Sequence, residues 1–308
     1  MLKIYQQTIS KPVNFAGIGL HSGKKSELSI LPAKGDKGIV FKRIDLKNNN
    51  EIKANFTNVS SAKLCTTLEN KFGVKVATVE HLLAALYIAE IDNAVIEINN
   101  EEVPILDGSS KIFLDKLKKA KKIELNQKRK YLKILRKVEL LDGEKVISID
   151  ASNNSFEVDF QLNYKNKIIG NQRNIVNFLT DQLLEVYQSR TFCLFKDIEK
   201  IKKAGLAKGG SLDNAVVIND NRVLNKDGLR NEKEFVNHKI LDLAGDFLLS
   251  GHRVLGKVFS CQGGHELTNK FLRKLFNSNT AFKITELEET IIPKKTAVNQ
   301  SIKLVVNA

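Results

Sequence analysis

The chain has 308 residues, a formal net charge of +14 at pH 7, 42% hydrophobic residues and 27% charged residues. This composition is typical of a globular protein with one large or two ordinary domains, and it excludes a disordered or fibrous chain. No apolar run approaches the roughly 18 residues of a membrane-spanning helix, and we expect no signal peptide. Three scattered cysteines without CxxC spacing favour free thiols and a cytoplasmic protein.

The positive charge is spread along the whole chain, where lysines are mixed with acidic residues. No zinc-finger, RNP-like or arginine-rich motif concentrates it, so we expect no nucleic-acid partner. A basic nucleic-acid-binding α+β protein remains a remote alternative, supported by charge alone. The cationic stretch 111–122 is interpreted as the solvated face of a helix, with peripheral membrane contact at most.

Periodicity predicts strands and helices in both halves of the chain. The first half contains strands at 26–31 and 94–98, a helix at 78–89 with Thr78 as its N-cap, and a helix at 110–121. The second half contains strands at 131–138, 145–150 and 156–164, then helices near 180–188, 197–204, 232–250 and 269–276. A basic, polar segment at 118–130 separates them. We therefore predict two similar α+β sandwich domains, 1–126 and 127–308.

Histidine is scarce, and the helix predicted at 232–250 carries His238, Asp242 and Asp246 at intervals of four. Residues four apart share a helix face with Cβ atoms roughly 5–6 Å apart, so His238 and Asp242 can reach one ion. Asp246 lies two turns from His238, roughly 12 Å along the axis, which suits a residue that orients a ligand. On spacing alone, an ordinary helix ion pair remains the alternative.

His81 supplies a third ligand in the other predicted helix, and Glu80 directly precedes it. Two imidazoles and one carboxylate suit a catalytic Zn²⁺ site with a fourth position open, although Fe²⁺ accepts the same ligands. Adjacent helical residues point in different directions, so Glu80 is expected to face a water as general base. The alternative is an acid favoured by the helix dipole in the first turn.

Three glycine-rich segments are interpreted as turns between elements: 17–23, 205–211 and 262–266. The first contains His21. The third places His265 after two glycines, and we expect this histidine on a flexible or tight loop and not in a core.

Several separate motifs, in order along nearly the whole chain, resemble the UDP-3-O-acyl-N-acetylglucosamine deacetylase family, zinc amidases of lipid A biosynthesis. These motifs are 17–23 (GIGLHSG), 78–86 (TVEHLLAAL), 91–93 (IDN), 104–109 (PILDGS), 189–192 (SRTF), 209–211 (GGS), 222–225 (RVLN), 238–246 (HKILDLAGD) and 263–265 (GGH). The resemblance implies two α+β sandwich domains with the active site between them.

The resemblance also assigns roles to individual residues. The zinc ligands are His81, His238 and Asp242. The catalytic residues are Glu80 as base, His265 as a cationic histidine, Asp246 as its carboxylate partner, and Thr191 near the carbonyl oxygen. The substrate-binding residues are Phe192, Lys239 near the diphosphate, Tyr164 as an aromatic contact for uridine, and His21.

An insert near 193–209 is implied to shape an apolar passage for an acyl chain. Cys193 and Leu194 stand where the family pattern has a glycine first, a departure that affects the expected acyl-chain length. Cys65 is implied to lie near the site.

The expected reaction is zinc-dependent hydrolysis of the N-acetyl group of UDP-3-O-(3-hydroxyacyl)-N-acetylglucosamine. It gives the free amine and acetate, an early committed step of lipid A biosynthesis. A zinc amidase acting on another acylated sugar nucleotide is the nearer alternative. We expect a cytoplasmic monomer.

Overall fold

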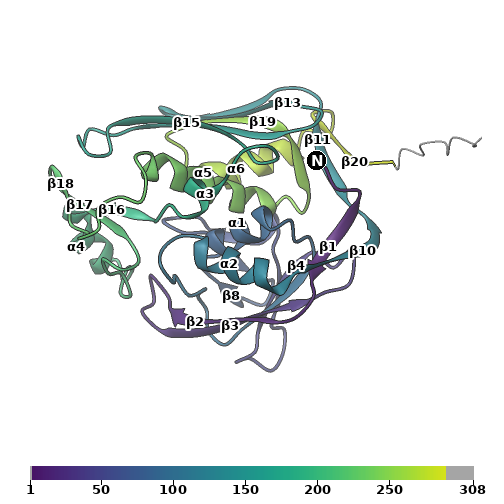
Figure 1. Ribbon diagram of the computed structural model, residues 1–308, viewed down its shortest axis with the longest axis horizontal. Helices are drawn as coiled ribbons and strands as arrows, with labels where there is room; N and C mark the ends of the chain where they lie inside the picture. Colours follow the sequence, from purple (N-terminus) through teal and green to yellow (C-terminus); the bar gives the residue numbers. More distant parts are fainter. Residues whose placement is uncertain (1, 289–308) are drawn as a thin grey trace, which may run out of the picture.

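The computed structural model describes residues 2–288 as stacked layers, with a sheet on each outer side and the helices between them (Figure 1). Each half of the chain contributes one main sheet and the helices that cover its inner face. The helices of the two halves meet at the centre of the molecule. The predicted α+β class with two sandwich-like layers is therefore confirmed.

The N-terminal half is built on a five-stranded sheet in the order β2-β3-β9-β4-β5. All neighbours are antiparallel except β9 and β4, which are parallel. Alternate side chains of β3 and β9 are buried, as the period of two predicts for a sheet covered on one face. The strands are β2 (Val13–Ile18), β3 (Lys25–Pro32), β4 (Ile39–Arg43), β5 (Glu51–Lys53) and β9 (Ala94–Ile98), and the helices are α1 (Glu80–Ile88) and α2 (Lys111–Ala120).

Two small sheets complete this half. One has the order β6-β7-β8 and the other pairs β1 with β10. The sheet changes between β10 and β11, at Arg129, a few residues beyond the predicted domain boundary at 126/127. Their elements are β1 (Tyr5–Ile9), the 3-10 helix η1 (Phe56–Asn58), β6 (Val59–Ser61), β7 (Thr67–Glu69), β8 (Lys75–Val76) and β10 (Lys122–Lys128).

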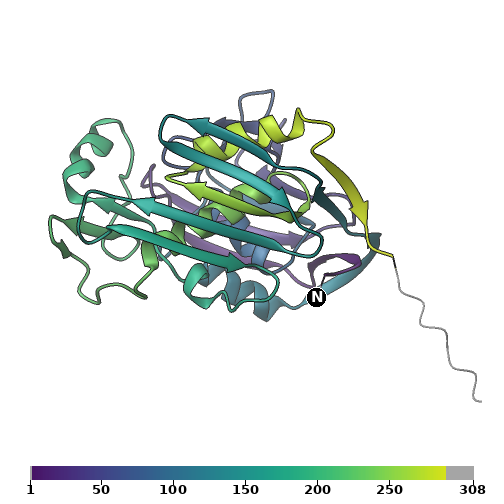
Figure 2. The same ribbon diagram turned by 90° about the horizontal axis from the view of Figure 1, so that it is seen from above.

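The C-terminal half is built on a seven-stranded sheet centred on β19, which is seen face-on in Figure 2. The first residues of β19 pair with β11, and its later residues lie between β13 and β14. The strands are β11 (Lys130–Ile134), β12 (Val138–Asp142), β13 (Lys145–Ala151), β14 (Phe156–Asn163), β15 (Asn171–Asn177), β19 (Arg253–Cys261) and β20 (Phe282–Glu286). The helices on its inner face are α3 (Leu184–Tyr187), α5 (Glu234–Leu248) and α6 (His265–Phe276).

A three-stranded sheet, β16-β17-β18, and α4 form a projection at one end of the molecule (Figures 1 and 2). No residue of α4 is buried. This projection contains the insert that we predicted near 193–209. Its elements are β16 (Phe192–Leu194), α4 (Phe195–Lys203), β17 (Val216–Asn219) and β18 (Arg222–Val223).

Two sequence predictions about helices are wrong. Thr78 does not cap α1, because its backbone has φ +57° and its hydroxyl donates to Glu102 at 2.9 Å. Val79 takes the capping position without a side-chain hydrogen bond. The helix predicted at 180–188 is reduced to the single turn of α3. Before this turn, the carboxylate of Asp181 accepts a hydrogen bond from the backbone N–H of Asn177.

Helix α1 is buried on nearly all sides, since it lies between the N-terminal sheet and α5. Gly245 of α5 lies against the backbone of α1. A Cβ atom at Gly245 would lie 2.2 Å from the carbonyl oxygen of Glu80 and 3.1 Å from the backbone nitrogen of Ala84. Only glycine therefore permits this packing, which brings residues of the two halves together.

Arg253 of the C-terminal half contacts the C-terminal end of α1. Its guanidinium lies 4.4 Å from the centroid of the Tyr87 ring and is buried. The guanidinium donates to the carbonyls of Tyr87, Leu86 and Ile91 and to the carboxylate of Asp92. It thus satisfies backbone acceptors that the end of a helix leaves free.

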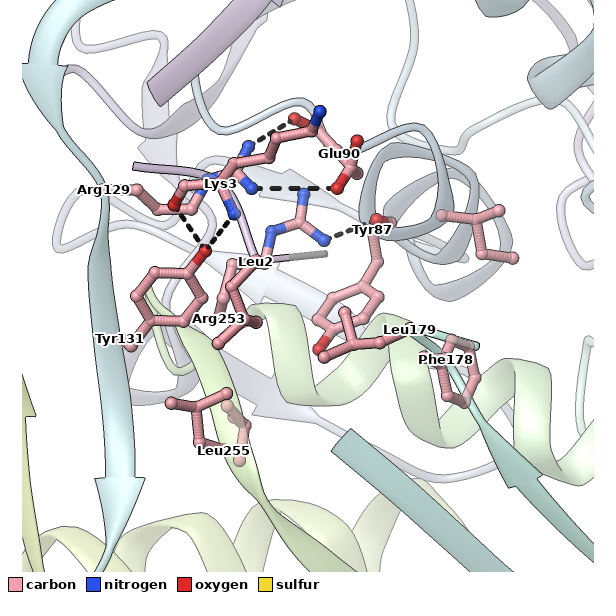
Figure 3. A pocket seen from close by; sticks show the side chains of 12 residues that line it. Leu2, Lys3, Tyr87, Glu90, Arg129, Tyr131, Phe178, Leu179, Arg253 and Leu255 are labelled. Carbon is pink, nitrogen blue, oxygen red and sulfur yellow. Dashed lines mark hydrogen bonds and ion pairs between the residues drawn. The ribbon is translucent and has the colours of Figure 1, made fainter. Parts of the chain in front are cut away.

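Arg129 binds the same carboxylate from the other side, with Nη2 2.7 Å from Oδ2 of Asp92. Figure 3 shows Arg129 and Arg253 beside Glu90 and Tyr131, around a cavity of about 200 Å³. Because both guanidinium groups are paired with carboxylates and carbonyls, we interpret this cluster as a clamp between the two halves.

No helix within residues 2–288 has both the length and the apolar content needed to cross a bilayer. The three cysteines are free thiols. Cys65 is buried, and burial raises its pKa to about 12.

We predict that Arg253→Ala lowers the free energy of unfolding by about 3–5 kcal/mol, because it leaves buried acceptors without their cation. Urea unfolding checks this. Lys257→Ala is the matched control, since Lys257 is an exposed cation of the same strand, and we expect a change within about 0.5 kcal/mol. Equal losses in both variants would contradict the clamp.

Candidate active site

Helices α1 and α5 bring His81, His238 and Asp242 together in the interior. The three side chains are buried, and one ligand atom from each lies within 4.8 Å of the other two. Nε2 of His81 and Nε2 of His238 lie 3.5 and 3.4 Å from Oδ1 of Asp242. The two imidazole rings are nearly perpendicular, with centroids 5.0 Å apart.

These residues have the properties that a divalent metal requires. Oδ1 of Asp242 is buried and has no hydrogen-bond partner among the described residues. Nδ1 of His238 lies 3.1 Å from the carbonyl oxygen of Ser189, which favours a proton on Nδ1 and leaves the Nε2 lone pair free for the cluster. An unpaired carboxylate oxygen between two imidazole nitrogens thus fits a bound cation.

His265 lies beside this cluster, between two carboxylates. Its Nδ1 is 2.7 Å from Oδ2 of Asp246, and its Nε2 is 3.6 Å from Oε1 of Glu80. Nε2 is also 3.8 Å from Oδ2 of Asp242. The structure therefore groups the second carboxylate of the α5 stripe with a histidine and not with the candidate ligands.

The expected loop position of His265 is wrong. His265 is the first residue of α6 and is buried. The two preceding glycines lead into the helix, and Gly264 has an extended backbone. The glycines indicated a turn correctly, but the helix begins directly after it.

Thr66 holds two of the carboxylates in place. Its hydroxyl donates to Oδ1 of Asp246 at 2.7 Å, and its backbone N–H donates to Oε2 of Glu80 at 3.0 Å. The segment before β7 thereby fixes acids from both helices. Cys65, the residue before it, does not line the cavity of the site.

The surroundings shift the pKa values of the site strongly. Burial lowers the pKa of His238 to about 3, which leaves it neutral. In contrast, burial raises the pKa of the Glu80 carboxyl group. Burial alone would lower the pKa of His265, but the surrounding carboxylates, led by Asp246, raise it to about 10. At neutral pH the site thus combines a neutral candidate ligand with a protonated histidine.

The candidate ligands, Glu80 and His265 open into a cavity of about 340 Å³ between the two halves. The four residues predicted to bind substrate, His21, Tyr164, Phe192 and Lys239, all line it. Thr191, which we predicted as a catalytic residue, lines it as well. Asp246 lies behind His265 and does not line the cavity.

Lys239 is closer to the cluster than the sequence suggested. Its Nζ lies 2.9 Å from Oδ2 of Asp242, and it stands 6.0 Å from the centroid of the Phe192 ring. The ring of Phe192 contacts Tyr164 edge-on, with centroids 6.1 Å apart. Lys239 therefore supplies positive charge beside Asp242, at a wall of the cavity.

A second, more apolar cavity of about 350 Å³ adjoins the first. Leu20, His21, Leu64, Thr191 and Phe192 line both. The other lining residues come mainly from the projection and include Cys193, Phe195, Ile198, Ile201 and Leu212. The site thus combines a polar, cation-binding part with an apolar part.

The amino-acid sequence matches the family model LpxC, described as UDP-3-O-acyl N-acetylglycosamine deacetylase, over residues 6–277. The chain belongs to this deacetylase family.

Three relatives named UDP-3-O-acyl-N-acetylglucosamine deacetylase show how far the similarity extends. The Geotalea uraniireducens protein is 41% identical, and the alignment covers 92% of each chain. The Pseudoalteromonas translucida protein is 39% identical, covering 94% of this chain and 96% of the relative. The protein of Shewanella sp. strain W3-18-1 is 42% identical, covering 93% and 94%.

Residues of the deacetylase site that the sequence did not reveal fall into two kinds. Thr66 contacts Glu80 and Asp246 through its backbone N–H and its hydroxyl, and Ser189 contacts His238 through its carbonyl oxygen. Sequence spacing does not reveal contacts of this kind. Lys63 and Lys145 line the cavity, but they are two of many lysines in a basic chain. Only the approach of distant segments distinguishes them.

We predict that Gly245→Ala weakens metal binding by about tenfold or more, because the added methyl group separates α1 from α5. Competition with a chromogenic chelator measures this. Ala244→Gly is the control: it costs roughly 1 kcal/mol of helix stability but adds no atom between the helices. If both variants bind metal like the wild type, the close approach is not what sets the metal geometry.

Proposed function

We propose that this deacetylase hydrolyses the N-acetyl group of UDP-3-O-(3-hydroxyacyl)-N-acetylglucosamine, releasing acetate and the free amine. The observation that carries the proposal is the group formed by Glu80, His265 and the His81/His238/Asp242 cluster, at the junction of a polar and an apolar cavity. An amidase needs a base, an acid and an electrophile, and this group offers all three.

The family is metal-dependent, and we assign the metal to His81, His238 and Asp242. Zn²⁺ is our choice over Fe²⁺, because two imidazoles and one carboxylate leave a fourth position open, as in catalytic zinc sites. When bound, Zn²⁺ acts as a Lewis acid that polarises a carbonyl oxygen and lowers the pKa of water toward about 7.

Glu80 is proposed as the general base. Burial raises its pKa, which brings its proton affinity closer to that of the water it activates. The backbone of Thr66 holds Oε2 of Glu80, and Oε1 remains directed toward His265 and the cavity. Glu80 can therefore take the proton of the attacking water as the new C–O bond forms.

His265 is proposed as the general acid. An amine leaves an amide carbon readily only after it is protonated, and His265 carries a proton at neutral pH. Asp246 holds Nδ1 at 2.7 Å, so Nε2 presents its proton to the site. After transfer, the C–N bond breaks and the sugar amine departs. Thr191, at the junction of the cavities, is proposed to donate to the carbonyl oxygen.

The cavities divide the substrate between them in this proposal. Phe192, Tyr164 and Lys239 contact the sugar-nucleotide portion, with the Lys239 ammonium near the diphosphate. His21 contacts the substrate where the two cavities meet. The apolar cavity, including the 193–209 insert, accepts the acyl chain. We further propose that the protein is a cytoplasmic monomer with at most peripheral membrane contact.

We predict that Glu80→Gln and His265→Ala each reduce kcat by about 10²–10⁴-fold, because each removes a proton-transfer group. Both variants should retain metal. Single-turnover kinetics with metal analysis on the same samples checks this. Full turnover in His265→Ala would exclude it as the acid.

The reaction itself is tested by comparing acylated and non-acylated UDP-N-acetylglucosamine as substrates, with elemental analysis of the wild type and His238→Ala. We expect higher kcat/KM for the acylated substrate, about one zinc per wild-type chain, and loss of metal in the variant. Equally poor turnover of both substrates would favour the alternative, an amidase that acts on another acylated sugar nucleotide. Salt-sensitive nucleic-acid binding without metal would favour the remote alternative.

A further inference from the structure

The loop 17–23 lies at the junction of the two cavities, and most of the hydrogen bonds that hold it there involve its backbone. Leu20 and His21 of this loop line both cavities. Within the loop, Gly19 donates to the carbonyl of Lys24 and accepts from the N–H of Gly23. These contacts close the turn but do not fix it to the rest of the molecule.

Glu102 holds the loop through hydrogen bonds to the loop backbone. The residue is only 2% exposed, and it lines neither cavity. Oε1 accepts from the backbone N–H of His21 at 2.8 Å, and Oε2 accepts from that of Ser22 at 2.7 Å. No Lys or Arg side chain within residues 2–288 forms an ion pair with it, so hydrogen bonds stabilise its charge.

The third donor to Glu102 comes from the entry to α1. The hydroxyl of Thr78 donates to Oε1 at 2.9 Å, and the backbone of Thr78 has φ +57°, a conformation unusual for a side chain branched at Cβ. Glu80 and His81 follow within three residues. One carboxylate therefore links the His21 loop to the start of the helix that carries the candidate base and a candidate metal ligand.

Two glycines show how tightly the loop is held. A Cβ atom at Gly19 would lie 2.2 Å from Oε2 of Glu102. On the opposite side, a Cβ atom at Gly209 would lie 2.3 Å from the carbonyl oxygen of Gly19. The backbone N–H of Gly209 also donates to the carbonyl of Leu20 at 3.0 Å. The loop is thus confined between Glu102 and the segment around Gly209, whose neighbours line the apolar cavity.

The position of the loop determines where the His21 imidazole lies. Its Nε2 is buried and has no hydrogen-bond partner among the described residues, while its Nδ1 accepts weakly from the N–H of Ala207 at 3.4 Å. An Nε2–H donor at the junction of the cavities suits a carbonyl or hydroxyl oxygen of the substrate. A displacement of the loop would move this donor away from that oxygen.

We propose that Glu102 is a positioning residue, which sets the His21 loop against the start of α1 and thereby selects acylated over non-acylated substrate. The inference rests on the proposed function. Glu102 contacts no reacting atom. Its effect is exerted at the junction where an acyl ester would pass from the polar to the apolar cavity.

The test compares Glu102→Gln with Glu101→Gln. The first variant is nearly isosteric, but its amide NH₂ would face a backbone N–H of the loop, so donor meets donor. The second alters the neighbouring residue, an exposed glutamate paired with Lys24 on the surface. Gly19→Ala provides a second disruption, since it pushes the loop off an intact carboxylate.

In Glu102→Gln and Gly19→Ala we expect the ratio of kcat/KM for acylated to non-acylated substrate to fall by about tenfold or more, with metal content unchanged. Glu101→Gln should keep the wild-type ratio. An unchanged ratio in both disrupting variants, or equal losses with both substrates, would overturn the inference.

Amide hydrogen exchange of residues 17–23 gives a readout independent of turnover. We expect exchange at His21 and Ser22 to accelerate in Glu102→Gln and to stay at the wild-type rate in Glu101→Gln. Unaltered exchange in Glu102→Gln overturns the positioning role. An inactive wild type whose loop responds in this way would instead count against the proposed reaction, and the two failures are thereby distinguished.

Discussion

The close packing of α1 against α5 at Gly245 is the constraint on which the active site depends. Packed helices ordinarily keep their axes 8–10 Å apart, and a single methyl group at this position would meet the backbone of Glu80. The candidate ligands lie on different helices, yet their ligand atoms come within 4.8 Å. A metal tolerates only small errors in such distances, so we expect the glycine contact to control the geometry of the cluster.

Charge in the interior is the second feature that organises the molecule. Three acids, Glu80, Asp242 and Asp246, lie buried around a protonated His265. Groups of this kind reduce stability unless each is paired or hydrogen-bonded. Here Thr66 supplies donors to two of the acids. The arrangement is explained by chemistry and not by stability, since it leaves Oδ1 of Asp242 without a protein partner.

The clamp at Arg253 and the confinement of loop 17–23 have similar roles at opposite ends of α1. Arg253, from the C-terminal sheet, satisfies the carbonyls at the end of the helix. Glu102, near its start, holds Thr78 and the loop. Contacts near both ends thereby hold the helix that carries Glu80 and His81.

The sequence by itself determined the α+β class, most of the strands, and the grouping of His238 and Asp242, because side-chain periodicity and helical spacing are local properties. The same spacing set Asp246 apart from the candidate metal ligands. Motif order along the chain also indicated the family.

Only the tertiary structure decided how these pieces meet. In the structure, His81 lies beside Asp242 of α5, and His265 is buried at the start of a helix. Thr78, predicted as a helix cap, donates a hydrogen bond to Glu102 instead. Thr66 and Glu102 were not predicted, because their functions depend on contacts between segments that lie 14 to 180 residues apart. No local pattern encodes such contacts, because they form only when the chain has folded. The contact between Thr66 and Asp246 also requires the two halves to pack together.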